Sequence, residues 1–309
     1  MNWLELIPSM LSAVASIGAA VAAFFSLSIS KRSMSIAEQS ALAVQHQSAS
    51  LEYSKVVNNL YETTKDYSEV SYSIWINWAK EIEHKYNCNS GGVNPRPLRH
   101  VLTNGSEMLV NYATRGNSFG GAAGKAILSV MIEGINGLNE AEYQKLLEKA
   151  DHCYSDFESV LGVPSKSRSI TSAPAFRWVC YQINKRVKAK DLRKIWKEAW
   201  LEDGYLNEHK NEYLKIVPIL VASRDSLKAE KAKLAHSAFP LESNTDLSKK
   251  YNEIIRILDD LLDSCNYEAL EAYQDWEYPE ELGPLVLCSL AIVYFVYEQL
   301  NLIYMSGDE

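Results

Sequence analysis

The first feature of the chain is an uncharged apolar run near its N-terminus. No charged residue occurs over residues 7–29, and a helix of this length covers about 35 Å at about 1.5 Å per residue. That length slightly exceeds the hydrocarbon core of a bilayer, so the pattern predicts a transmembrane helix within residues 1–32. Lys31 and Arg32 follow the run, and basic residues stay on the cytoplasmic side. We therefore expect a single-pass protein of the bacterial inner membrane, with its N-terminus outside and the rest in the cytoplasm.

The predicted span has two unlike faces. At about 100° per residue, one arc collects small or hydroxylated side chains and another collects bulky apolar ones. The small face consists of Ser9, Ser12, Ser16, Ala19, Ala23, Ser26 and Ser30. In lipid, such a face lets helices approach closely, while its hydroxyls bond across the contact or line a wet centre. The pattern fits a plain anchor, a packed seam without a pore, or a conducting bundle of a homo-oligomer.

A long helix is predicted to connect the span to the rest of the chain. Residues 33–86 contain no Pro or Gly, and Ile36, Ser40, Ala43 and Val57 belong to a stripe with three- and four-residue steps. We expect one connecting helix over residues 33–88, either a self-associating stalk or a helix lying on the body. The Gly-, Asn- and Pro-rich residues that follow mark the first domain boundary.

An all-α cytoplasmic domain is predicted over residues 98–309, because no run alternates convincingly with period two. Helical patterns cover residues 98–114, 123–136, 139–161, 173–201, 205–235, 246–273 and 283–304. The apolar part of the last pattern is shorter than the roughly 18 residues that a span requires. A buried core helix is therefore favoured there over a second span.

Composition and motifs argue against several classes of function. The net charge of −8 disfavours a chain that is basic throughout, as many duplex-DNA binders are. The five cysteines include no C-x-x-C pair and the six histidines no H-x-x-x-H pair, which predicts no metal site. The Gly-rich residues 116–126 depart from the phosphate-loop pattern, since Phe119 replaces a required Gly and Ala126 a required hydroxyl. We expect neither an enzyme nor a cofactor.

One stretch carries a local charge of the opposite sign. Residues 166–197 hold many basic side chains and a single acid, Asp191, with aromatic residues between them. A cationic helix face with stacking rings suits a single-stranded nucleic acid or a nucleotide. The candidate ligand-binding residues are Arg186, Lys190, Arg193, Lys194, Trp196 and Lys197. The alternative is a surface helix whose charges pair with the acidic residues 253–281, with the tryptophans facing the core.

The overall layout resembles a known family. The sequence Ser28-Ile29-Ser30-Lys31-Arg32-Ser33 closes a span of small residues, and Ile36-Ala37-Glu38-Gln39-Ser40 begins a long polar helix. This layout is similar to the membrane effectors of the Hailong anti-phage defence system. The resemblance implies a tetramer whose N-terminal helices form an ion channel that depolarises the membrane. It also implies a body that binds a single-stranded oligodeoxyadenylate, which holds the channel shut. The alternative is a membrane-tethered helical binding or scaffold protein without a pore.

Overall fold

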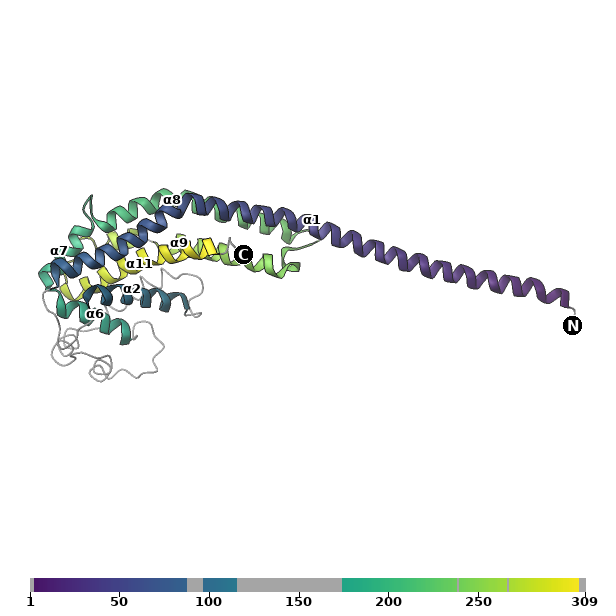
Figure 1. Ribbon diagram of the computed structural model, residues 1–309, viewed down its shortest axis with the longest axis horizontal. Coiled ribbons are helices and arrows are strands. Elements are labelled where there is room, and N and C mark those ends of the chain that lie inside the picture. Colours follow the sequence, from purple (N-terminus) through teal and green to yellow (C-terminus); the bar gives the residue numbers. More distant parts are fainter. Residues whose placement is uncertain (1–2, 88–96, 116–173, 238, 266, 306–309) are drawn as a thin grey trace.

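The computed structural model describes residues 3–87, 97–115, 174–237, 239–265 and 267–305, and this part of the chain contains helices and no strand. The all-α prediction is confirmed for these residues. Figure 1 shows a bundle of helices from which the N-terminal part of one very long helix projects.

That long helix is α1, Trp3–Tyr86, with 84 residues. At about 1.5 Å per residue it is about 126 Å long. The uncharged residues 7–29 and the predicted connecting residues 33–86 therefore lie in one uninterrupted rod. The domain limits predicted from the sequence stay a prediction, since the helix itself shows no break between them.

Burial divides α1 into two parts. Residues 23–44 are almost all exposed, whereas buried residues recur at three- or four-residue steps from His46 onward. This buried stripe consists of His46, Ala49, Tyr53, Val56, Val57, Leu60, Thr64, Tyr67, Ser68, Ser71, Ile74, Trp75, Trp78, Ala79, Ile82 and Tyr86. Of the predicted connecting helix, residues 46–86 lie on the body and residues 33–44 stand clear of it; self-association of the latter stays a prediction.

The other described helices pack around this second part of α1. They are α2 (Leu98–Arg115), α6 (Pro174–Arg186), α7 (Ala189–Ala199), α8 (Tyr205–Ala235), α9 (Thr245–Ser264), α10 (Tyr267–Glu271) and α11 (Pro279–Met305), with a 3-10 turn, η2 (Leu241–Ser243). Helices α2, α8 and α11 agree closely with the sequence patterns. The helices predicted over residues 123–136 and 139–161 and the Gly-rich run lie outside the described residues.

Two predicted helices are each divided in the structure. The prediction of one helix over residues 173–201 is wrong, because Lys188 is extended (φ −67°, ψ 146°) between α6 and α7. Its carbonyl accepts the backbone N–H groups of Asp191 and Leu192, which starts the new helix. Neither Pro nor Gly marks this position, and the residues on either side of it, Val187 and Leu192, are both buried. The pattern over residues 246–273 likewise divides into α9 and α10.

Helix α11 forms the centre of the body. It packs against α1, α2, α6, α7 and α9, and residues 282–293 are all buried. Figure 1 shows it between α1 and α2. Among the described residues it is the one helix that is long and apolar enough to cross a membrane, over Glu281–Met305. Of the residues in its apolar part, 72% are buried inside the fold. This burial is what a core helix requires. The N-terminal span stays a prediction, since the side chains of residues 3–22 lie outside those described.

Hydrogen bonds attach α1 to helices on several sides. Trp75 Nε1 donates to Ser106 Oγ of α2 at 2.8 Å, and Thr64 Oγ1 lies 3.0 Å from Tyr304 OH of α11. Ser226 Oγ of α8 donates to Glu52 Oε1 at 2.6 Å. Tyr251 OH of α9 donates to the Ala49 carbonyl at 2.8 Å. Buried polar groups are costly unless paired, so these bonds also select one register of α1 in the body.

Candidate functional site

The predicted small-residue seam lies on the projecting part of α1. The members whose side chains fall outside the described ones are Ser9, Ser12, Ser16 and Ala19. The members that are described and exposed are Ala23, Ser26 and Ser30. Their role in a seam or pore stays a prediction.

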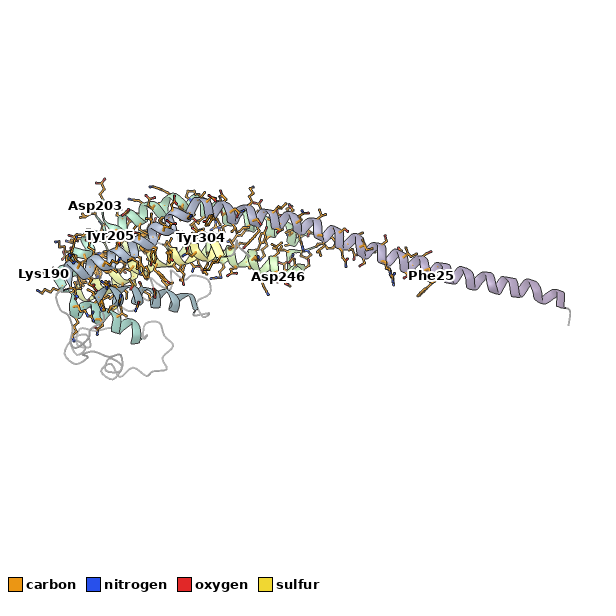
Figure 2. The ribbon with its side chains drawn as sticks, in the orientation of Figure 1. Phe25, Lys190, Asp203, Tyr205, Asp246 and Tyr304 are labelled. Carbon is orange, nitrogen blue, oxygen red and sulfur yellow. The ribbon has the colours of Figure 1, made fainter. Side chains whose placement is uncertain are left out.

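Large apolar side chains are exposed on the same part of α1. Phe24, Phe25, Leu27 and Ile29 are between 57% and 72% exposed. In Figure 2, Phe25 stands out from the projecting helix, far from the body. Moving one such side chain from water to an apolar environment is worth about 1.5–3 kcal/mol. The row therefore favours a surrounding of acyl chains or of a further protein chain.

Helix α7 presents a cationic face to solvent. The exposed cations on it are Lys190, Arg193, Lys194 and Lys197. The opposite face is buried and consists of Leu192, Ile195, Trp196 and Ala199. Figure 2 shows Lys190 at the end of the body opposite to Phe25. Four of the six candidate ligand-binding residues are thus brought together on one exposed surface, which we call the α7 cationic face.

The other two candidates, Arg186 and Trp196, lie in the core. The Trp196 side chain is fully buried, and its indole N–H donates to the Tyr273 carbonyl at 2.8 Å. Arg186 is buried at the end of α6, where its guanidinium donates to Gln182 Oε1 at 3.3 Å. Burial lowers the pKa of Arg186, while the nearby Glu83 acts in the opposite direction. Because α6 ends at Arg186 and α7 begins at Ala189, Arg186 and Lys190 lie on different helices and do not share a helix face.

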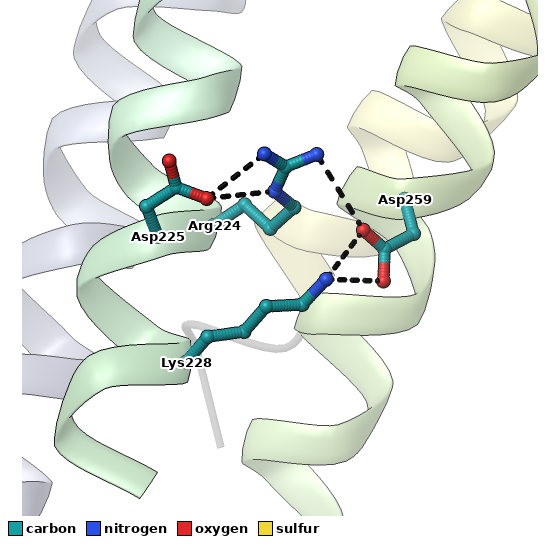
Figure 3. Close-up of polar contacts among 4 residues, drawn as sticks. All are labelled: Arg224, Asp225, Lys228 and Asp259. Atoms are coloured by element: carbon teal, nitrogen blue, oxygen red, sulfur yellow. Dashed lines mark hydrogen bonds and ion pairs between the residues drawn. The ribbon is translucent and has the colours of Figure 1, made fainter. Parts of the chain in front are cut away.

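The acidic residues 253–281 find charged partners on α8. Figure 3 shows Asp259 of α9 with Lys228, whose Nζ lies 2.8 Å from Oδ1, and with Arg224 at 3.8 Å. Arg224 also pairs with its neighbour Asp225 at 2.9 Å. Glu271 of α10 forms an ion pair with Lys210, also from α8. Asp259 and Glu271 are therefore paired away from the α7 cationic face, whereas Asp275 and Glu277 line a pocket with Arg193 of that face.

The α7 cationic face is only partly paired within the body. Arg193 Nε donates to the Glu277 carbonyl at 3.0 Å, and Lys194 lies 3.6 Å from Glu198 on its own helix. For Lys190 and Lys197, no ion pair occurs among the described residues. An anion that approaches this face meets charges that remain largely available.

A cleft of about 410 Å³ lies beside this face, where the last turns of α1 meet the end of α7 and the start of α8. Its charged and hydroxyl-bearing wall contains Glu81, Lys85, Tyr86, Glu198, Asp203 and Tyr205. The buried Trp78 lies behind this wall, with its ring stacked 6.2 Å from that of Tyr205. In Figure 2, Asp203 and Tyr205 lie at the same end of the body as Lys190.

Each of two carboxylates in the cleft is held by a lysine and a tyrosine. Glu81 accepts from Lys85 at 2.5 Å and from Tyr205 OH at 2.8 Å. Burial alone would raise the pKa of Glu81, but the bonds from Lys85 and Tyr205 outweigh it and hold that pKa below its usual value. Burial and the bond to Glu81 raise the pKa of Tyr205 to about 12.

The second carboxylate, Glu198, accepts a hydrogen bond from Tyr86 OH and faces Lys194. Burial, and then this bond, raise the pKa of Tyr86. Gly204 closes the wall beside it, since a Cβ there would lie 2.3 Å from the Glu198 carbonyl oxygen. A residue without a side chain is therefore required for α8 to begin so close to the end of α7.

A buried cluster of hydroxyls surrounds His209 of α8. The imidazole Nε2 lies 3.0 Å from both Tyr67 OH and Ser71 Oγ of α1, and Nδ1 bonds Tyr267 OH of α10. Burial lowers the pKa of His209 to about 3, so the ring is neutral at neutral pH. The side chains of His209, Tyr67, Ser71 and Tyr267 are all buried, and the cluster serves to join three helices.

The comparisons with known proteins assign no family to this arrangement. No protein-family description, curated protein or solved structure matches the chain. Within the described residues, no group of three or more His, Cys, Asp or Glu side chains is placed to hold a metal ion. A function for the chain therefore rests on its own residues and geometry.

The cleft was missed by reasoning from the sequence. Its two tyrosine bonds join Tyr86 to Glu198 and Glu81 to Tyr205, across 112 and 124 residues. No local spacing indicates such contacts, because they exist only once α1, α7 and α8 are packed together. The acidic Glu198 was visible in the sequence only as one charge at the end of a basic helix.

Proposed function

We propose that the chain is an oligomeric effector of the bacterial inner membrane, a ligand-gated ion channel that depolarises the membrane in anti-phage defence. In this proposal residues 7–29 span the bilayer and the body lies in the cytoplasm. One observation carries it: α1 continues without a break from the uncharged run into the core of the body. A shift of the body is then transmitted to the span by a rigid helix.

The exposed apolar row supports the placement in a membrane. Phe24, Phe25, Leu27 and Ile29 lack cover from the body, and Lys31 and Arg32 follow them directly. Residues 30–45 separate this row by about 24 Å of helix from His46, the first residue of α1 that is buried among the described side chains. The body can therefore stand clear of the lipid headgroups while the rods of several chains meet in the bilayer.

The small-residue face supports the assembly. Ser12, Ser16, Ala19 and Ala23 permit close approach of helices, and the serine hydroxyls can line a wet centre in a tetramer. A ligand closes such a pore only if it binds the closed state better. Moving the population from about 1:99 to 99:1 requires about 5.5 kcal/mol of that preference, which several charge-assisted contacts in each subunit can supply together.

The α7 cationic face is the proposed ligand surface. Lys190, Arg193, Lys194 and Lys197 attract an anionic ligand, either a single-stranded oligodeoxyadenylate or another nucleotide. Binding to phosphates releases counterions, so the affinity should fall steeply as salt rises. The tryptophan at position 196 does not stack on the ligand in this proposal, because its ring is buried.

Assembly is tested by the mass of the full chain solubilised from membranes in detergent. The proposal predicts a tetramer, and a smaller particle when Ser16→Leu and Ala23→Leu fill the small face. The control is Val14→Leu with Val21→Leu, which enlarges side chains on the bulky face of the same helix and should leave the tetramer intact. A monomeric wild-type chain, or a tetramer in both variants, would show that the small-residue face does not hold the chains together.

Ligand binding is tested with a fluorescent single-stranded oligodeoxyadenylate and the full chain. The variant Lys190→Glu with Arg193→Glu and Lys197→Glu should lose most of the affinity and of its salt dependence. The control Lys215→Glu with Lys233→Glu and Lys249→Glu makes the same charge change at exposed positions elsewhere. Equal affinities in the two variants would show that only net charge matters and that α7 is not the site.

A further inference from the structure

We propose that the cleft between α1, α7 and α8 binds a small organic dication, an aliphatic diamine or polyamine, through the carboxylates of Glu81 and Glu198. This site adjoins the α7 cationic face, since Lys194 of that face also contacts Glu198, but it takes a ligand of the opposite charge. The inference stands on the cleft alone and does not depend on the proposed membrane function.

The hydrogen-bonding capacity of the cleft selects a donor. The hydroxyl hydrogens of Tyr86 and Tyr205 are already donated to Glu198 and Glu81, so both phenol oxygens are left with lone pairs. The carboxylates accept only, and Asp203 adds an exposed third one. Three carboxylates against Lys85 and Lys194 leave this wall with a net charge of −1. A ligand that bonds these acceptors must bring N–H donors, and positive charge favours its binding.

The protein's own lysines show how an ammonium group sits there. Lys194 Nζ faces Glu198 and lies 5.7 Å from the centre of the Tyr86 ring, which is a cation–π position. The charges of Glu81 and Glu198 both raise the pKa of Lys85, so the two carboxylates act on one cation from the same neighbourhood. Two ammonium groups on one short chain can therefore replace two separate lysines.

Both lysines are replaceable, because their side chains are 52% and 62% exposed and exposed ion pairs contribute little to stability. A displaced lysine regains solvent without leaving a buried charge behind. The methylene chain of a diamine would lie against Tyr205 and Leu201, the apolar or aromatic lining residues that keep accessible surface. The volume of about 410 Å³ is within the usual range of small-molecule sites, about 300–1,000 Å³.

The test is calorimetric titration of 1,4-diaminobutane into the full chain in detergent. We expect one site per chain, with affinity lowered about tenfold or more by Glu81→Gln or by Glu198→Gln, since each removes a charge-assisted contact. The matched control is Glu202→Gln, an exposed acid next to the cleft that does not line it. Absence of binding by the wild-type chain, or an equal loss in the control, would overturn the proposal.

A second variant separates binding from folding, since Glu81 and Glu198 also brace the helices. Lys194→Met removes the ammonium that competes for Glu198 and keeps both carboxylates, so it should raise the affinity for the diamine. A loss of structure cannot produce that gain. Unchanged or weaker binding by Lys194→Met would contradict the site, as would displacement of the diamine by Mg²⁺ at matched ionic strength, which indicates charge screening alone.

Discussion

Tyr86, in the last turn of α1, donates its hydroxyl hydrogen to Oε2 of Glu198 in α7, across 112 residues of sequence. The bond between Tyr205 and Glu81 joins the same end of α1 to α8. Together they fix the end of α1 that lies farthest from the projecting N-terminal part. A helix that acts as a lever needs such a fixed end, and here it adjoins both the cleft and the α7 cationic face.

Removal of the Tyr86 hydroxyl should weaken this attachment. We expect Tyr86→Phe to lower the free energy of unfolding by about 1–3 kcal/mol, because a hydrogen bond to a charged group is lost and Glu198 is left short of a partner. Urea denaturation of the full chain measures it. The control is Tyr72→Phe, the same chemical change at an exposed position. Similar losses in the two variants would show that the Tyr86 hydroxyl contributes no specific stabilisation.

The His209 cluster predicts how stability depends on pH. The folded chain holds the pKa of His209 at about 3, below the value of about 6.5 for an unfolded histidine. Between these pH values the unfolded chain binds a proton that the folded chain does not. The free energy of unfolding is therefore not reduced by His209 above about pH 6.5, and it falls as the pH drops below that value. The contribution is about 1.4 kcal/mol for each pH unit.

Denaturation series between pH 7 and pH 5 isolate this contribution. The slope of stability against pH should decrease in His209→Gln, whatever the absolute stability of that variant, because the titrating group is gone. His100→Gln, at an exposed position, should keep the wild-type slope. A slope that His209→Gln leaves unchanged would mean that other groups cause the pH dependence.

His46 marks the point where α1 leaves the body, and its side chain is buried although neither ring nitrogen has a hydrogen-bond partner among the described residues. An unpaired buried polar group costs free energy. His46→Leu should therefore stabilise the chain by about 1–2 kcal/mol in thermal or urea unfolding. His46→Gln, which keeps a polar group, should bring no such gain. A Leu variant less stable than the wild type would show that the imidazole is bonded in solution.

The sequence predicted those elements whose signals are local. Helix α8 follows its helical pattern, and α11 is recognised from a run of apolar residues. In the structure α11 is long and apolar enough to cross a membrane, and most of its apolar part is buried in the core. The rod α1 follows from the lack of Pro and Gly over residues 33–86. In each case the information lies within one segment, so no knowledge of its neighbours is needed.

Features that arise from packing were not predicted. The break at Lys188 has no Pro or Gly to signal it, and it moves Arg186 into the core and away from Lys190. The spacing of Trp196 fits a stacking ring as well as a core residue, and its full burial and its bond to the Tyr273 carbonyl show that it faces inward. The cleft depends on contacts between segments more than a hundred residues apart, which one sequence does not reveal.

The central claim, that residues 7–29 of assembled chains form a conducting pore, is tested most directly by membrane potential in bacteria that express the full chain without its restraining ligand. The comparison is a chain whose residues 7–29 are replaced by a plain leucine helix, which still anchors the body but offers no small, hydroxylated face. The account predicts depolarisation by the natural chain and a normal potential with the leucine helix. Depolarisation by both chains would place the pore elsewhere, and a normal potential with both would contradict the channel and favour a membrane tether.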